Sequence, residues 1–248
     1  MSIDISVLIP AYQAEKYLAE TLASVHAQTF SPAEIIVVND GSTDATGDIA
    51  SAHGASIIHH ETNLGISDAV NHGIAQCRCE WVAFLDADDL WLPEKLSRQV
   101  ERLNQLGKAA EHTCVFTHLE QFISPDLSSE EKAKIVLENT ILPGAIKSTL
   151  LMHRSVFDRV GKFDRKWRVG DFIDWYARAK ELGIGEAMLP DVLARRRIHA
   201  SNMSRKDHSE RKDMAAILLQ SIKRRRAMQN KDFSPADDHS PHPSPNPS

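Results

Sequence analysis

The chain has 248 residues, of which 42% are hydrophobic and 25% are charged, as in an ordinary globular protein of one large or two small domains. No apolar run approaches the roughly 20 residues of a membrane-spanning helix, and the N-terminus lacks the basic and apolar segments of a signal peptide. Three cysteines without framework spacing argue against a disulfide-stapled secreted fold. These features together predict a cytoplasmic protein.

The net charge of −5 is unevenly distributed along the chain. Residues 195–226 contain eleven Lys or Arg and only three acidic residues, so the remainder is strongly acidic. An acidic body with one basic segment argues against a general nucleic-acid-binding protein. We expect the basic segment to face phosphate groups or an anionic membrane surface.

Apolar, β-branched runs alternate with segments of helical spacing in the first half of the chain. The runs cover residues 5–10, 35–38, 56–59 and 81–85, and the helical segments cover 14–28, 43–53, 66–77 and 92–106. This alternation predicts an α/β fold with a mostly parallel, Rossmann-type sheet flanked by helices. Such sheets bind their ligands at the carboxyl ends of the strands.

The second half is less regular, and we expect it to form a smaller subdomain beside the first. Residues 111–205 continue the same domain, and residues 206–230 form a basic C-terminal helix that opens with a capping box, Asp207 to Glu210. Residues 231–248 are rich in Pro and Ser, which predicts a disordered tail.

Carboxylates follow two of the predicted strands directly. The second strand ends in Asp40-Gly41-Ser42-Thr43-Asp44, and the fourth ends in Asp86-Ala87-Asp88-Asp89. Carboxylates gathered at neighbouring strand ends repel one another unless a cation or hydrogen-bond donors compensate them. An Asp-x-Asp pair in this position can bind Mg²⁺ or Mn²⁺ through hard oxygen ligands. The alternative is that these residues are helix caps and turn residues.

Four motifs in order resemble those of family 2 glycosyltransferases. They are Val-Leu-Ile-Pro-Ala-Tyr at 7–12, the strand and loop at 34–44, Asn-x-Gly-x-x-x-Ala-x-Asn-x-Gly at 63–73, and Asp-Ala-Asp-Asp at 86–89. The resemblance covers residues 3–200. It implies a GT-A fold and an inverting, metal-dependent transfer of a sugar from a nucleotide-diphosphate donor, a UDP-sugar, to an acceptor hydroxyl. It also implies a role in cell-surface glycan biosynthesis, with a glycan or a lipid-linked molecule as acceptor.

The resemblance assigns roles to residues of the first half, with residues 1–110 forming the nucleotide-sugar-binding half. Donor-binding roles fall on Pro10, Ala11 and Tyr12 at the base, Asp40 at the base imide, Asn71 in the third motif, and Asp86 near the ribose and the metal. The resemblance also makes Asp88 a ligand of Mn²⁺ or Mg²⁺. Two positions depart from the family pattern: Gln13 replaces the usual Asn, and Val70 replaces a common basic residue.

The catalytic base is expected in the segment 170–176, which looks like a variant of the family's Glu-Asp-x-Asp-Leu-Trp sequence. Asp171 and Asp174 are three residues apart on a predicted helix, so both point to one face. Inverting transfer needs one carboxylate that takes the acceptor proton. Asp171 is the favoured base and Asp174 the second candidate, and the alternative is a capping Asp171 with an exposed Asp174.

The segment 195–202 resembles the Arg-x-His sequence that closes over the donor diphosphate in this family. The resemblance makes His199 a ligand of the metal or the diphosphate, and Arg197 a clamp for phosphate oxygens. The alternative is a basic surface strand. Retention of these residues argues against a non-catalytic nucleotide-binding module. The first loop, with neither Gly nor Arg, argues against a nucleotidyltransferase.

An apolar stripe lies in the predicted C-terminal helix at 210–228. Met214, Ile217, Leu218 and Ile222 share a face, and four basic residues follow at 223–226. Two interpretations remain open here. The helix holds the protein peripherally against an anionic membrane, or the stripe packs on the catalytic domain and the basic residues are solvated.

Overall fold

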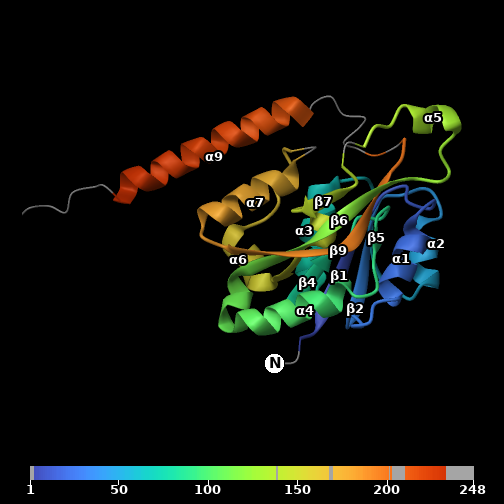
Figure 1. Cartoon of the computed structure of the whole chain (residues 1–248), viewed down its shortest axis with the longest axis horizontal. Coiled ribbons are helices and arrows are strands. Elements are labelled where there is room, and N and C mark those ends of the chain that lie inside the picture. The colour runs from blue at the N-terminus through green and yellow to red at the C-terminus, as the bar shows by residue number, and fades with distance from the viewer. Residues whose placement is uncertain (1–2, 138, 168–169, 201, 203–209, 233–248) are drawn as a thin grey trace, which may run out of the picture.

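The computed structural model describes residues 3–137, 139–167, 170–200, 202 and 210–232 (Figure 1). Within these residues, nine strands form one sheet in the order β3-β2-β1-β4-β8-β6-β9-β5, with β7 paired to β6. The strands are β1 Ile5–Ala11, β2 Glu34–Asp40, β3 Ser56–His60, β4 Trp81–Phe84, β5 Leu90–Trp91, β6 Thr113–Ile123, β7 Ile141–Gly144, β8 Leu151–His153 and β9 Gly185–Ile198.

Helices cover both faces of this curled sheet. They are α1 Leu18–His26, α2 Thr46–Ala52, α3 Ile66–Gln76, α4 Lys95–Leu106, α5 Ser129–Ala133, α6 Arg154–Val160, α7 Asp171–Glu181 and α9 Glu210–Asp232, with 3₁₀ turns η1 Gly107–His112 and η2 Lys147–Thr149. One core cluster joins the sheet to α1, α2 and α4, and the other joins it to α3, α6 and α7. The β1 side chains alternate between the two clusters, as the period of a strand requires.

The first four strands pair in parallel, as the sequence predicts. β1 pairs with β2 and β4, and β2 pairs with β3, so their carboxyl ends meet at one edge of the sheet. Gly73 shows why this half packs closely. A Cβ at Gly73 would lie 2.2 Å from Leu8 Cδ1, so only glycine lets α3 approach β1.

The second half changes the character of the sheet. β6 and β9 are parallel to each other, but β8 runs antiparallel to β4 and β6, β7 antiparallel to β6, and β5 antiparallel to β9. The sheet is therefore mixed, and the predicted parallel arrangement holds for its first four strands. β7 returns beside β6 after a loop that carries only the short α5, and a connection without a crossover produces an antiparallel pair.

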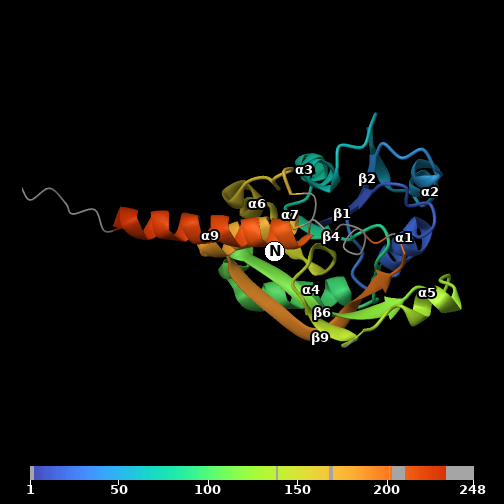
Figure 2. The ribbon, with the colours of Figure 1, turned by 90° about the horizontal axis from the view of Figure 1, so that it is seen from above.

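α9 packs along α7 and runs past the body of the protein (Figure 2). It ends at Asp232, beyond the predicted end at residue 228. Ile217 is buried, whereas Met214, Leu218 and Leu219 are 42%, 58% and 59% exposed. The predicted apolar stripe is therefore divided between a packed face and an exposed face.

Two further expectations for the C-terminal region fall outside what the structure describes. The predicted capping box begins at Asp207, within the undescribed residues 203–209, and the predicted disordered tail falls almost entirely on residues 233–248. Residues 231 and 232 belong to α9. Among the helices of the described residues, none has both the length and the apolar character needed to cross a membrane.

Candidate active site

Three segments distant in sequence meet beyond the carboxyl end of β4. The first is the predicted metal motif, residues 86–89, which directly follows the strand. The second is the end of β9 with His199, Ala200 and Asn202, and the third is η2 with the first turn of α7. Their contacts define a candidate active site at the edge of the sheet where parallel strands bind ligands.

Asp88 and His199, both predicted metal ligands, are in contact. His199 Nε2 lies 2.8 Å from Asp88 Oδ2, and Asn202 Nδ2 donates to the same oxygen at 3.4 Å. Asn202 also fixes the turn after β9, because its Oδ1 accepts a hydrogen bond from the His199 backbone at 2.6 Å. The His199 ring packs against Tyr17 with centroids 4.8 Å apart. Residues 111 positions apart thus form one acid–imidazole pair.

Asp86 and Asp89 are carboxyls whose negative charge is poorly compensated. Burial raises the pKa of Asp86; Lys147 opposes this rise and the Asp88 charge adds to it. Burial, followed by the charges of Asp88 and Asp86, holds the pKa of Asp89 well above its usual value. Asp89 points inward, where it accepts hydrogen bonds from Ser148 Oγ at 2.7 Å and from the Arg197 backbone at 3.0 Å. Asp89 therefore ties β9 and η2 to the motif.

The donor set around Asp88 fits a divalent cation by its chemistry. Carboxylate oxygens suit Mg²⁺ and Mn²⁺, and an imidazole suits several transition metals. Burial disfavours the charged form of Asp86 and raises its pKa in spite of the charge of Lys147, and a bound cation would favour that charged form. Within the described residues, no three such side chains are already arranged around one point. The residue types therefore suit the ion, but the described residues do not form a complete coordination site.

Arg197 is buried inside the protein, and its guanidinium contacts other protein groups. Its Nη2 donates to Glu20 at 2.5 Å and its Nε to the Asp88 carbonyl at 2.9 Å. The guanidinium also stacks between Tyr17 and Phe122, each 4.7 Å from its centre. With 2% of its side chain exposed, Arg197 holds β9 against α1 and the metal motif. The role of Arg197 as a phosphate clamp stays a prediction.

Lys147 is a site residue that sequence reasoning missed. Its Nζ donates to Asp171 Oδ2 at 2.9 Å, and both side chains are about nine-tenths buried. Burial alone would lower the pKa of Lys147, but the carboxylates of Asp171 and Asp86 outweigh it and raise that pKa. Lys147 is thus a buried cation that joins α7 to the metal motif. No sequence signal marks it, because a single lysine in an irregular segment matches no motif.

Asp171 and Asp174 have different surroundings although they lie on the same helix. Asp171 is the first residue of α7, and Lys147 is its hydrogen-bond donor. Asp174 is paired on both oxygens, with Arg178 Nε 3.0 Å from Oδ2 and Arg224 Nη1 3.2 Å from Oδ1. Asp174 therefore fastens α9 to α7. Its two ion pairs distinguish it from a carboxylate that is ready to accept a proton.

The expected base pocket lies at the ends of β1 and β2. Pro10 and Ala11 are buried in the last part of β1, and Tyr12, the next residue, is 51% exposed. Asp40 accepts hydrogen bonds from the backbone N–H groups of Leu64 and Gly65, at 2.9 and 2.8 Å. The carboxylate of Asp40 therefore holds the loop before α3.

A pair of histidines completes the surroundings of Asp40. His60 Nδ1 lies 2.6 Å from Asp40 Oδ1, and His60 Nε2 lies 2.9 Å from His72 Nδ1. The two imidazole rings stack with an interplanar angle of 9°. Both oxygens of Asp40 are thus engaged within the protein, in addition to any bond to a base.

Asn71 is engaged by the protein backbone. Its Nδ2 donates to the Phe163 carbonyl and its Oδ1 accepts from the Phe163 N–H, both at 2.9 Å. The side-chain amide therefore mimics a strand partner for Phe163 and fixes the loop between α6 and α7 against α3. The nucleotide-binding role of Asn71 stays a prediction.

Comparison with known proteins identifies the family. The family model described as Glycosyl transferase family 2 matches residues 6–161. The chain belongs to glycosyltransferase family 2. A glycosyltransferase of Rickettsia typhi is 33% identical over 206 residues, which cover 79% of this chain and 64% of the relative. The putative teichuronic acid biosynthesis glycosyltransferase TuaG of Bacillus subtilis is 30% identical over 153 residues, which cover 59% of this chain and 58% of TuaG.

The chain therefore spans less than two thirds of the length of each of these two family 2 relatives. Among solved structures, S. aureus TarS in complex with UDP-GlcNAc superimposes with a TM-score of 0.69 at 20% identity, covering 88% of this chain and 66% of that one. This likeness shows the fold, which is the GT-A-like fold expected from the sequence.

We predict that Asn71→Ala lowers the free energy of unfolding by about 2 kcal/mol, because it leaves the N–H and carbonyl of Phe163 without partners. Urea denaturation measures this change, with Asn104→Ala on the exposed side of α4 as the control. UDP affinity, from titration of the folded protein, should stay within twofold of the original. A large loss of UDP affinity at unchanged stability would restore the nucleotide-binding role.

Proposed function

We propose that this chain transfers a sugar from a UDP-sugar to an acceptor hydroxyl with inversion, using Mn²⁺ or Mg²⁺. The observation that carries this proposal is the pair of Lys147 and Asp171 beside the metal motif. The membership in family 2 supports the reaction class, and the UDP-GlcNAc bound to S. aureus TarS supports a UDP-sugar as donor. The names of TuaG and of its biosynthetic product support a role in cell-surface glycan synthesis.

Asp171 is the base in this proposal. A single displacement needs one ionised carboxylate that takes the acceptor proton as the new glycosidic bond forms. Asp171 lies at the N-terminus of α7, where the helix dipole favours a negative charge, and Lys147 holds its Oδ2. The proton would go to the carboxylate, and the electron pair of the broken sugar–phosphate bond would go to the departing UDP. The two arginine partners of Asp174 support the choice of Asp171 over Asp174.

Asp86, Asp88 and His199 would hold the cation. The chemistry that bound Mn²⁺ or Mg²⁺ supplies here is stabilisation of the negative charge that develops on the departing diphosphate. His199 and Asn202 position Asp88 from one side, and Lys147 adds a positive charge near Asp86 from the other.

A panel of nucleotide sugars with Mn²⁺ tests the function as a whole. Release of nucleoside diphosphate that depends on an acceptor supports the transferase. Release of pyrophosphate from a sugar phosphate and a nucleoside triphosphate would instead indicate a nucleotidyltransferase. Tight nucleotide-sugar binding without any release would indicate a binding module.

The assignment of the base gives a paired prediction. Asp171→Asn should lower kcat by roughly 10²- to 10⁴-fold with little change in donor affinity, because the base acts on the acceptor proton. Asp174→Asn should keep most of kcat but lower the free energy of unfolding by about 1–3 kcal/mol, because two arginines lose their anion. Steady-state kinetics and thermal unfolding separate the two. If only Asp174→Asn lowered kcat, the catalytic base would be Asp174 and the assignment of Asp171 would be wrong.

The metal motif gives a second paired prediction. Asp88→Asn should reduce metal-dependent turnover at least 10²-fold and weaken Mn²⁺ binding, since it removes an anionic ligand. Asp89→Asn is the matched control one residue away. Its carboxyl faces inward with a raised pKa, so the neutral amide should preserve Mn²⁺ binding. Titration with Mn²⁺ measures both, and equal Mn²⁺ affinity in the two variants contradicts the assignment.

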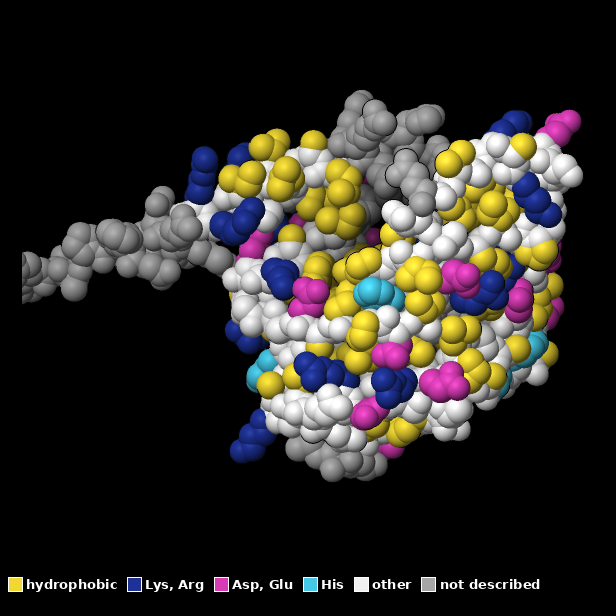
Figure 3. All heavy atoms as spheres, in the orientation of Figure 1, with side chains coloured by type: hydrophobic (Ala, Val, Ile, Leu, Met, Phe, Trp, Pro, Cys, Tyr) yellow, Lys and Arg dark blue, Asp and Glu magenta, His cyan; other side chains and the backbone are white. Residues whose placement is uncertain are grey.

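A peripheral contact with an anionic membrane is part of the proposal. The exposed face of α9 carries Leu218 and Leu219, and hydrophobic side chains gather along this helix (Figure 3). Lys223, Arg225 and Arg226 follow near its end, whereas Arg224 turns inward to Glu181 and Asp174. Leu218 and Leu219 are exposed where Ile217 is buried, and the three basic residues that follow would attract an anionic surface.

Flotation with vesicles of phosphatidylcholine and phosphatidylglycerol tests this contact. We expect binding at low salt that is lost at high salt, since three basic residues contribute roughly 3 kcal/mol. Replacing Lys223, Arg225 and Arg226 by Gln should abolish flotation, while Arg224 is kept so that α9 stays docked. No flotation of the original protein at low salt refutes the contact.

A further inference from the structure

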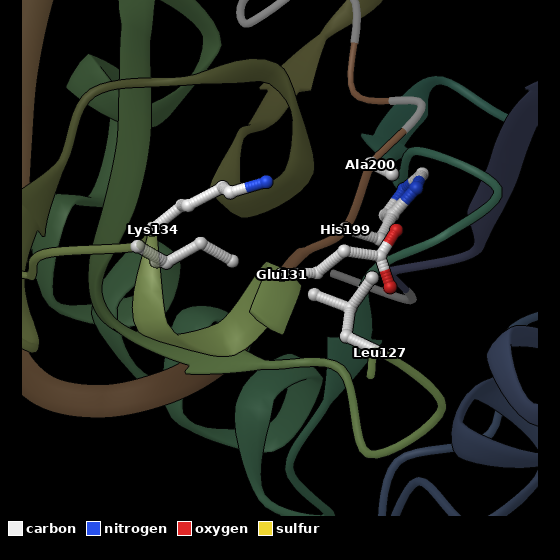
Figure 4. Close-up of a pocket in the computed structure, with 6 residues that line it drawn as sticks. Leu127, Glu131, Lys134, His199 and Ala200 are labelled. Carbon is white, nitrogen blue, oxygen red and sulfur yellow. The ribbon is translucent and has the colours of Figure 1, made fainter. Parts of the chain in front are cut away.

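A pocket of about 200 Å³ lies between the segment around α5 and the end of β9 (Figure 4). The residues that line it are Leu127, Glu131, Lys134, Ile135, His199 and Ala200. Its position is defined by His199, because the same imidazole contacts the metal motif at Asp88. The pocket therefore opens directly beside the candidate active site, although none of its α5 residues belongs to that site.

We propose that this pocket binds the acceptor, and that the bound part is a sugar or polyol that carries a negative charge. That the ligand is the acceptor rests on the proposed function. The chemical class of the ligand is argued from the residues that line the pocket. Three features of the pocket wall indicate this class of ligand: a carboxylate held by hydrogen bonds, an ammonium group and an apolar surface.

The fixed carboxylate belongs to Glu131. Its Oε2 accepts a hydrogen bond from the Ser128 backbone at 2.8 Å, and its own N–H donates to Ser128 Oγ at 3.2 Å. This capping box sets the direction of the side chain, which brings the carboxylate beside His199 (Figure 4). The carboxylate of Glu131 is thus held at the wall of the pocket, where it can accept hydrogen bonds. Hydroxyl groups are suitable donors to it.

The ammonium group belongs to Lys134, whose side chain extends toward His199 and Ala200 (Figure 4). The neighbouring Lys132 is used differently, because its Nζ donates to the Pro125 carbonyl at 2.8 Å. Lys134 thus supplies the positive charge of this pocket, and a phosphate or carboxylate on the ligand would complement it.

Leu127 and Ile135 supply the apolar part of the wall. Leu127 is buried and Ile135 is half-buried, so both present a surface that is already partly withdrawn from water. The C–H face of a sugar ring or polyol chain can pack there while its hydroxyls reach Glu131. Together the three features select a hydroxylated anion, whose charge is either a phosphate or a carboxylate.

Binding of three small probes to the full chain tests the proposal. The probes are glucose 6-phosphate, glucuronate and glucose, which differ in the charged group. At low salt, we expect at least one of the two anions to bind about tenfold more tightly than glucose, as measured by ligand-observed NMR titration. A preference for glucose 6-phosphate identifies a phosphate site, and a preference for glucuronate a carboxylate site. Equal binding of all three probes overturns the proposal.

Variants of the wall locate the binding. Lys134→Gln should remove the tenfold preference for the anion, and Lys134→Arg should keep it. Lys132→Gln is the matched control from the same segment and should change nothing. Glu131→Gln retains the capping-box hydrogen bonds, so the fold is preserved, but it should weaken all three probes about threefold by presenting an amide instead of a carboxylate. An anion preference that survives in Lys134→Gln places the binding elsewhere and overturns the proposal.

The proposed function is measured separately, by release of UDP from UDP-sugars. Failure of that release with intact, Lys134-dependent anion binding refutes the transferase but leaves the pocket. Release of UDP without any Lys134-dependent binding refutes the pocket but leaves the transferase.

Discussion

Crowding of carboxylates is the constraint that organises this half of the molecule. Asp86, Asp88 and Asp89 lie within four residues at the end of a buried strand, where three negative charges repel one another strongly. Each is stabilised by a different element: Asp86 by the charge of Lys147 from η2, Asp88 by His199 after β9, and Asp89 by Ser148 and the Arg197 N–H. The end of β9 and η2 thus both contact the motif, and burial keeps the pKa values of Asp86 and Asp89 raised in spite of these partners.

The sequence predicts the part of the fold that local patterns determine. Buried parallel strands are continuous β-branched runs, so residues 5–10, 35–38 and 81–85 could be identified, and the order of the motifs pointed to the family that comparison confirms. The mixed sheet could not be foreseen in the same way. The pairing of β6 with β9 joins residues about seventy positions apart and includes register shifts near His118, and no local pattern encodes either feature.

The site shows the same division between local and long-range information. Asp88 and His199, which the structure brings into contact, were each expected from the motifs as metal ligands, whereas Lys147 matches none of the motifs. Asn71 and Arg197 belong to recognisable segments, yet their side chains bind Phe163 and Glu20. A motif identifies a position in the chain but not the atom that a side chain contacts. An amide or guanidinium can satisfy a distant backbone group as readily as a ligand, and the fold decides between the two.

The two aspartates of α7 show how one helix separates catalysis from assembly. Asp171 and Asp174 are three residues apart, so a helix places them on one face, and the sequence could not rank them by geometry alone. The difference comes from α9, whose Arg224 reaches Asp174 and Glu181 while its exposed leucines point away. Among the described residues, Arg224 and Arg178 pair with Asp174, whereas Lys147 pairs with Asp171. Docking of α9 thus engages one of the two aspartates in assembly, and it also fixes the helix that carries both relative to the exposed apolar face of α9.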